Sequence, residues 1–330
     1  MAQTKRELNQ KQIDTFHRQG YVVIDDLLAP ADLQPVIDEI SREITQRASA
    51  LVADGLLPET FEALGFERQL IAIDAHVKTF VPGISNAGLT GPAIFDLIGH
   101  PAVLDIAELF CGPELIASSV YRLRPKLPND ARGEVPWHQD SGYLDPYCDG
   151  ALILTFWIPL IDATIERGCL YVLPEAHHGP VLHHQPNVEG NYLEIPDNCL
   201  PDRQPVAVPV RKGSVLMFTN RLPHVSFQNT SDVVRWSMDL RYQSAELPTN
   251  ATIANRETVA AHTDVQVPLA CYPPAADFLV RSSARPGEVL PDPERFHQMR
   301  KAHRARFDAA STTVKSTGRA INPFSLQRWP

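Results

Sequence analysis

Residues 233–243 read VVRWSMDLRYQ, and this stretch decides the fold class. Side chains two positions apart lie on the same face of a β-strand. One face would carry apolar side chains: Trp236, Met238, Leu240 and Tyr242. The other would carry polar ones: Arg235, Ser237, Asp239 and Arg241. The apolar face can pack on a core, whereas the charged face must line a cavity, meet solvent or pair internally.

Similar short apolar runs fill the chain between Leu115 and residue 233, separated by Pro, Gly, Asn and Asp. They are IASSVYRLRP (116–125), ALILTFWIPL (151–160), CLYVLP (169–174), PVAVPV (205–210), SVLMFT (214–219) and HVSFQ (224–228). Several short strands with turn residues between them predict an antiparallel sandwich or barrel. The 29 prolines agree with many loops around such a framework.

The N-terminal third has a helical pattern instead. We expect helices over 8–20, 31–53 and 93–110, the last in two pieces broken at Pro101, and a β-prone run over 21–28. Residues 56–90 give no clear assignment. Helices before strands predict a β core with a helical layer packed outside it.

We expect one domain over residues 1–330, because no linker, repeat or low-complexity tract interrupts it. Its parts would be a helical layer (about 1–110), the β core (about 115–245) and a C-terminal extension (246–330). The extension is irregular and proline-rich, with a short helix expected near 293–307.

Composition limits the partners and the compartment. The chain has 44% hydrophobic and 21% charged residues, which argues against a disordered protein. Its net charge of −9 argues against nucleic acid or anionic membranes as partners. No apolar N-terminal run and no 18-residue apolar stretch occur, so we expect a cytoplasmic protein.

The five cysteines are widely spaced without a C-x-x-C pair, which predicts reduced thiols in the core. A homodimer is left open.

A candidate metal site begins with Trp137-His138-Gln139-Asp140. On a strand His138 and Asp140 would point to one side and Gln139 away from it. His224 is the best third ligand from elsewhere. Two imidazoles and one carboxylate on one face of an octahedron leave three open positions, the pattern of non-haem Fe(II) oxygenases. An H-x-D pair alone is uninformative.

Arg235 points to a second component of this site. A guanidinium binds a carboxylate through two parallel hydrogen bonds, and the distal carboxylate of 2-oxoglutarate needs such an anchor. Ser237 could add a hydroxyl. The alternative is an arginine paired with Asp239 or a surface acid. On the strand 151–160, Thr155 and Trp157 share a face, and Trp157 is either a wall of this pocket or a core residue.

Other histidines and tyrosines are candidates for substrate contacts. His177, His178, His183 and His184 lack a carboxylate in ligand register, so we interpret this cluster as a surface loop with His177 nearest the site. Substrate would meet the loops 143–149 and 177–191. The candidate contact residues are Tyr143, Tyr147, His177 and Arg241.

These motifs together resemble the phytanoyl-CoA dioxygenase superfamily of Fe(II)- and 2-oxoglutarate-dependent oxygenases. The resemblance runs from the opening IDTFHRQGYVVIDDLL to about Tyr242, through WHQD (137–140), GCLYVLPEAHHG (168–179) and GSVLMFTNRLPH (213–224). It implies a mainly β fold with flanking helices around a double-stranded β-helix, a cupin-like jelly-roll. It also implies His138, Asp140 and His224 as metal ligands, and Arg235 as the 2-oxoglutarate anchor. Trp157, Thr155, Ser226 and Ser237 fall around the keto-acid pocket.

Two features refine this resemblance. The family's central Asn-Gly and Pro-Gly-Ser-His are here Arg167-Gly168 and Pro174-Glu175-Ala176-His177, which puts the substrate in question rather than the iron chemistry. Asp140 keeps the carboxylate that halogenating relatives lack. We therefore expect Fe(II), 2-oxoglutarate and O2 to support hydroxylation of a C–H bond in a small metabolite or natural-product intermediate, releasing succinate and CO2. The alternatives are a cupin-like metal enzyme without 2-oxoglutarate and a non-catalytic binding protein.

Overall fold

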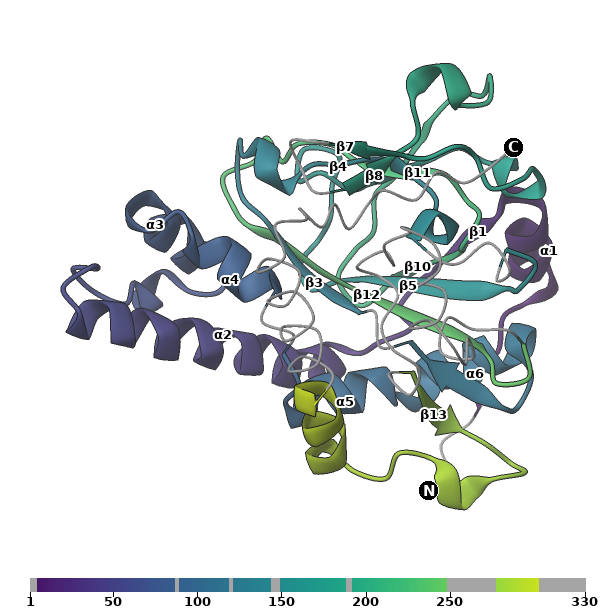
Figure 1. The fold of residues 1–330 in the computed structure, drawn as a ribbon, viewed down its shortest axis with the longest axis horizontal. Coiled ribbons are helices and arrows are strands. Elements are labelled where there is room, and N and C mark those ends of the chain that lie inside the picture. Colours follow the sequence, from purple (N-terminus) through teal and green to yellow (C-terminus); the bar gives the residue numbers. More distant parts are fainter. Residues whose placement is uncertain are drawn as a thin grey trace, which may run out of the picture.

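The computed structural model of the protein describes residues 5–86, 89–118, 121–143, 149–187, 192–247 and 277–302 (Figure 1). The named α-helices are α1 (Gln10–Gln19), α2 (Pro30–Ala53), α3 (Gln69–His76), α4 (Phe80–Asn86), α5 (Pro92–Ile98) and α6 (Pro101–Cys111). The strands are β1 (Tyr21–Ile24), β2 (Leu115–Ala117), β3 (Arg122–Lys126), β4 (Val135–His138), β5 (Ile153–Pro159), β6 (Leu170–Val172), β7 (Gln185–Asn187), β8 (Tyr192–Glu194), β9 (Val206–Val208), β10 (Val215–Thr219), β11 (His224–Ser226), β12 (Arg235–Ser244) and β13 (Phe278–Arg281). Short 3-10 helices include η1 (Glu62–Leu64), η2 (Ala131–Gly133), η3 (Asp140–Tyr143), η5 (Ala176–His178), η6 (Asp197–Cys199) and η8 (Pro286–Glu288).

The strands form antiparallel sheets. The large sheet has the order β1-β10-β5-β12-β2-β13, and β3 also pairs with β12. A four-stranded sheet has the order β4-β11-β6-β9, and β7 and β8 form a two-stranded ribbon. Helices α2, α5 and α6 lie on one side of the large sheet, and β4 and β11 lie on the other (Figure 1). This arrangement is the jelly-roll core with flanking helices that the family resemblance implies.

The alternation of side chains on β5 and β12 places the core between these layers. Leu154, Phe156 and Ile158 of β5 pack toward the helices, together with all four apolar side chains of β12. Trp157 faces the smaller sheet instead and packs there with Leu170 and Phe218. The charged face of β12 therefore lies between the two sheets, where it can line a cavity.

Local signals explain where the first helix begins and ends. Asn9 and Gln12 form a capping box, in which each side chain binds the other's backbone N–H at 3.0 Å. Gly20 ends α1 in the left-handed conformation at φ 83°. A Cβ at Gly20 would lie 2.5 Å from the His177 ring, so this position needs glycine for space as well as for conformation.

The expected elements are largely confirmed, including β1 within the β-prone run over 21–28, and two strands from outside the expected β core extend the large sheet. Both proline-separated helices, α5 and α6, are present, and residues 293–302 are helical within the expected 293–307. The helical layer, however, contributes β1 to the large sheet through its pairing with β10. The irregular C-terminal extension contributes β13, which pairs with β2. Both are sheet additions from outside the 115–245 core.

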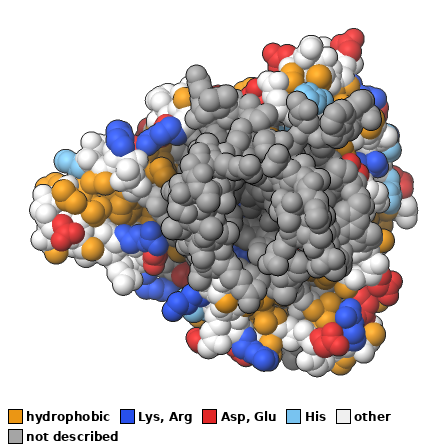
Figure 2. Space-filling model, in the orientation of Figure 1, with side chains coloured by type: hydrophobic (Ala, Val, Ile, Leu, Met, Phe, Trp, Pro, Cys, Tyr) orange, Lys and Arg blue, Asp and Glu red, His pale blue; other side chains and the backbone are white. Residues whose placement is uncertain are grey.

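Two of the three described cysteines lie in the core. Cys111 and Cys169 are buried free thiols, as expected, whereas Cys199 is half-buried. Burial raises the pKa of Cys111 to about 12. Cys148 and Cys271 lie outside the described residues. Hydrophobic side chains gather on the projecting part of the molecule around the end of α2 (Figure 2), where Leu56 and Leu64 are at least half exposed. No described helix combines the length and apolar character needed to cross a membrane.

Candidate metal centre

His138 and His224 face each other across a strand pair. They are register partners at the ends of β4 and β11, and their ring centroids are 4.1 Å apart. His138 Nδ1 lies 2.8 Å from the Pro136 carbonyl oxygen, and His224 Nδ1 lies 3.0 Å from that of Leu222. If each Nδ1–H donates to its carbonyl, each Nε2 keeps a lone pair for a metal.

Asp140 joins the two imidazoles, although not by strand alternation as expected. Strand β4 ends at His138, and Asp140 is the first residue of the 3-10 helix η3. The turn nevertheless brings one carboxylate oxygen and one nitrogen of each imidazole within 4.8 Å of one another. Two nitrogens and one hard oxygen fit Fe(II), and this group is the one that could hold a metal ion among the described residues.

Burial and charge prepare all three side chains for a cation. Each is at most 5% exposed. Burial lowers the pKa of His138 and His224, so both imidazoles are neutral at pH 7. Burial would raise the pKa of Asp140, but the Arg241 guanidinium and the imidazoles hold this pKa well below its ordinary value. The site therefore offers two neutral nitrogens and one carboxylate, each in its metal-binding form.

Gln139 points away from this group, as expected, and ties it to the segment before β7. Its side chain donates to the Arg221 carbonyl at 2.6 Å and accepts from the Leu182 N–H at 2.7 Å. Its backbone N–H donates to His184 Nε2 at 3.0 Å. His184 is 1% exposed and His177 is 7% exposed, so the interpretation of this histidine cluster as a surface loop is wrong for both.

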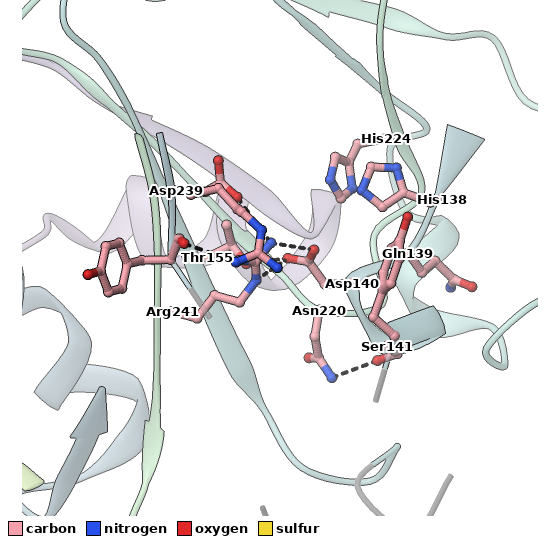
Figure 3. Close-up of polar contacts among 12 residues, drawn as sticks. His138, Gln139, Asp140, Ser141, Thr155, Asn220, His224, Asp239 and Arg241 are labelled. Carbon is pink, nitrogen blue, oxygen red and sulfur yellow. Dashed lines mark hydrogen bonds and ion pairs between the residues drawn. The ribbon is translucent and has the colours of Figure 1, made fainter. Parts of the chain in front are cut away.

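A chain of alternating charges continues from Asp140. Arg241 binds both oxygens of Asp140, and Thr155 donates to the same carboxylate (Figure 3). Asp239 accepts from Arg241 at 3.4 Å and from Arg124 at 2.8 and 3.2 Å. The alternative of an Arg235–Asp239 pair is therefore not realised, since Asp239 is held by other arginines.

Arg235 is the first residue of β12 and is 1% exposed. Its guanidinium donates to the Ser237 hydroxyl and, at 3.2 Å, to the Ser226 hydroxyl, and its carbon lies 5.3 Å from the centre of the Trp157 ring. Burial lowers its pKa to about 10, which leaves it charged at pH 7. Its Nε and the Trp157 indole nitrogen are buried without a hydrogen-bond partner in the described protein.

A cavity connects this arginine with the imidazoles. Its empty volume is about 360 Å³ when the open solvent at its mouth is included. Its lining comes from both sheets: Arg124, Val135, His138, Thr155, Trp157, Leu170, Phe218, His224, Ser226, Arg235, Asp239 and Arg241. The polar face of β12 thus lines a cavity, the first of the three options that its sequence leaves open.

Sequence reasoning missed two cations of β3. Arg124 binds Asp239, and Lys126 is 2% exposed and donates to the carbonyl oxygens of Ser226 and Phe227. Burial, with the nearby Arg235, lowers the pKa of Lys126 to about 6. The available signal was the alternation of basic residues in RLRPK (122–126), within a run otherwise expected to be core.

The substrate candidates separate into different places. Tyr143 lies beside His138 with ring centroids 5.8 Å apart, and its hydroxyl binds the backbone of Leu193. Arg241 lines the cavity but binds Asp140. His177 contacts the His17 carbonyl and the His178 ring and is not among the described residues that line the cavity, so its contact with substrate stays a prediction. Tyr147 lies outside the described residues.

Comparison with solved structures supports the fold. The chain resembles the non-heme monooxygenase ThoJ in its apo form, with a TM-score of 0.55 and 19% sequence identity over 91% of this chain and 98% of that one. At this identity the likeness concerns the fold alone.

Comparison with known sequences identifies the family. Residues 16–237 match the family model "Phytanoyl-CoA dioxygenase (PhyH)". The chain is 26% identical to a phytanoyl-CoA dioxygenase of Arabidopsis thaliana over 73% of this chain and 95% of the relative. It is 30% identical to "phytanoyl-CoA dioxygenase domain-containing protein 1" of Danio rerio over 69% and 87% of the two chains. The chain therefore belongs to the phytanoyl-CoA dioxygenase family of oxygenases, which use Fe(II), 2-oxoglutarate and O2.

Proposed function

We propose that this chain is a 2-oxoglutarate-dependent dioxygenase that hydroxylates a C–H bond of a small metabolite or natural-product intermediate. His138, Asp140 and His224 would hold Fe(II) through two imidazole nitrogens and one carboxylate oxygen. Bound Fe(II) supplies the centre at which 2-oxoglutarate and O2 react. One oxygen atom of O2 would enter the substrate as a hydroxyl group and the other would enter succinate, as CO2 leaves 2-oxoglutarate.

The proposal depends on one observation: the buried guanidinium of Arg235 and the neighbouring indole of Trp157 each have an N–H group without an acceptor. No described carboxylate lies within ion-pair distance of Arg235, whose Nε has no acceptor, and the indole N–H of Trp157 has none either. Burying such groups without partners is unfavourable, and a bound ligand can offset the cost. The distal carboxylate of 2-oxoglutarate supplies acceptor oxygens and the matching charge.

Other residues of the chain would orient the reactants and exclude water. Ser226 and Ser237 hold the guanidinium of Arg235 in the cavity that both imidazoles also line. Phe218 and Leu170 line the same space and would keep water from the reacting atoms. Tyr143, beside His138, stays our proposed substrate contact.

The test measures binding of 2-oxoglutarate to the anaerobic Fe(II)-loaded protein by equilibrium dialysis. Removing the charged partner of a buried carboxylate costs about 2–5 kcal/mol, so Arg235→Ala should weaken binding at least about 30-fold while Fe(II) stays bound. Arg281→Gln is the matched control, because Arg281 forms ion pairs with Asp105 and Glu108 outside the cavity. Fe(II) binding without 2-oxoglutarate binding in the native protein would favour the cupin-like alternative. Binding of neither would favour a non-catalytic protein.

A further inference from the structure

The carboxylate of Asp140 accepts three hydrogen bonds from two side chains. The Thr155 hydroxyl donates to Oδ2 at 2.5 Å, and Arg241 Nε donates to the same oxygen at 3.0 Å. Arg241 Nη2 donates to Oδ1 at 2.7 Å. In Figure 3, Asp140 lies between the Arg241 guanidinium and the two imidazoles. Its hydrogen-bond donors and its proposed metal partners are thus on different sides.

The two oxygens of Asp140 are therefore not equivalent. Each oxygen of a carboxylate offers about two acceptor positions in its plane. Both positions of Oδ2 are filled, by Thr155 and by Arg241 Nε. Oδ1 accepts one bond and keeps one position open for a metal.

We propose that Thr155 and Arg241 are positioning residues that restrict Asp140 to binding the metal through Oδ1 alone. This inference rests on the proposed function. Three protein ligand atoms on one face of an octahedron leave three positions, two for the keto-acid and one for O2. A carboxylate that bound through both oxygens would take a fourth position and compete with 2-oxoglutarate.

The fold makes this restraint rigid. Thr155 on β5 and Arg241 on β12 are direct register partners, so adjacent strands hold both donors on one side of Asp140. Arg241 is held in turn by Asp239, which Arg124 of β3 grips with two hydrogen bonds. Donors on paired strands are placed more accurately than donors on loops.

The experiment compares Fe(II) affinity and 2-oxoglutarate affinity in the anaerobic full-length protein. Thr155→Val keeps the side-chain volume and removes the hydroxyl, which frees one position on Oδ2. We expect its Fe(II) affinity to stay within about threefold of native, since a second oxygen can now bind the metal. Its 2-oxoglutarate affinity should fall about tenfold, the factor expected for roughly one net hydrogen bond. Thr155→Ser, which keeps the hydroxyl, should restore the native affinity.

Arg241→Gln provides a second, independent variant, because it removes the two-pronged contact without altering β5. This variant should also keep its Fe(II) affinity and lose 2-oxoglutarate affinity. If Thr155→Val loses its native melting transition, these two affinities of Arg241→Gln test the inference instead. Arg281→Gln again controls for the loss of an arginine ion pair. The visible charge-transfer absorption of Fe(II)-bound 2-oxoglutarate should appear in the variants at higher 2-oxoglutarate concentrations than in the native protein.

Two results would overturn the inference while leaving the proposed function intact. One is unchanged 2-oxoglutarate affinity in the variants. The other is a parallel fall of Fe(II) and 2-oxoglutarate affinity in the variants, which marks a general structural role. If the native protein itself binds no 2-oxoglutarate in the presence of Fe(II), the proposed function fails and the inference fails with it.

Discussion

Buried side chains of the same type can have different tasks, depending on whether their donor atoms have acceptors within the protein. Trp157 and Trp236 show this most clearly, since both are buried yet lie on opposite faces of the large sheet. The indole N–H of Trp236 donates to the Phe66 carbonyl at 3.0 Å, whereas that of Trp157 has no acceptor in the described protein and lies at the cavity. Trp236 therefore stabilises the fold, and the indole N–H of Trp157 is available to a ligand.

This difference predicts opposite results for one substitution at two positions. Trp157→Phe removes a donor to a charged carboxylate, worth about 1.5–3 kcal/mol, so 2-oxoglutarate affinity should fall roughly 10- to 100-fold. Trp236→Phe leaves the buried Phe66 carbonyl unpaired and should lower the melting temperature with little effect on 2-oxoglutarate affinity. Dialysis and thermal melts on both variants check the pair. Equal 2-oxoglutarate affinity in the two would remove Trp157 from the keto-acid site.

Residue types and their order along the chain predict the candidate metal ligands and Arg235, but not the hydrogen bonds that hold these side chains. His138, Asp140, His224 and Arg235 can be picked out because few arrangements of two imidazoles, a carboxylate and an arginine suit another chemistry. The hydrogen bond from Thr155 to Asp140 could not be foreseen. It depends on the register of β5 against β12, and side-chain alternation gives a strand's faces without its register.

At the level of elements, strand ends matter as much as strand faces. The convergence of Asp140 on the imidazoles comes from the turn η3 after β4, so its cause is a chain reversal that the H-x-D spacing does not encode. The turn before β6 works similarly. Gly168 has a φ of 69°, and a Cβ there would lie 2.8 Å from the Phe227 carbonyl oxygen and 3.0 Å from Lys126. This turn packs directly against the segment that follows β11.

Gly168→Ala should therefore destabilise the protein more than an alanine at an open glycine of similar conformation. Left-handed backbone alone costs a non-glycine residue about 1–2 kcal/mol. Gly55, with a φ of 72° and nothing within 4 Å of a Cβ, isolates that cost. Urea denaturation should show a larger loss for Gly168→Ala than for Gly55→Ala. Equal losses would mean that the close approach to Phe227 is unimportant.

Segments near the two ends of the chain add the outer strands of the large sheet. Strand β1 extends the large sheet beside β10, and β13 extends it beside β2. Glu114, just before β2, accepts hydrogen bonds from the Ser282 and Ser283 hydroxyls and from the backbone N–H groups of Ser283 and Ala284. The sequence predicts the helices, the strand-rich core and the β-prone run over 21–28 that contains β1. It does not predict β13 or the partners of these two strands, since pairing between distant segments leaves no local periodicity.

The Glu114 contacts predict a pH-dependent attachment of the segment 277–290. The Ser282 hydroxyl and the Ala284 N–H lower the pKa of Glu114 from 4.5 to about 2. A lowered carboxyl pKa means that the stabilisation is complete above pH 4.5 and is lost as the pH falls toward 2. Hydrogen exchange, corrected for intrinsic rates, should show loss of protection in this segment over that window. Glu114→Gln should show weakened protection already at pH 7, and native-like protection there would contradict the assignment.

Anaerobic equilibrium dialysis with Fe(II) tests most directly whether His138, Asp140 and His224 form a metal site. The native chain should bind one Fe(II), and Asp140→Ala, which removes the oxygen ligand but keeps both imidazoles, should lose this binding. Asp239→Asn gives a control, since Asp239 is an equally buried acid that contacts arginines rather than the imidazoles. One Fe(II) bound with undiminished affinity by Asp140→Ala would contradict the proposed metal centre.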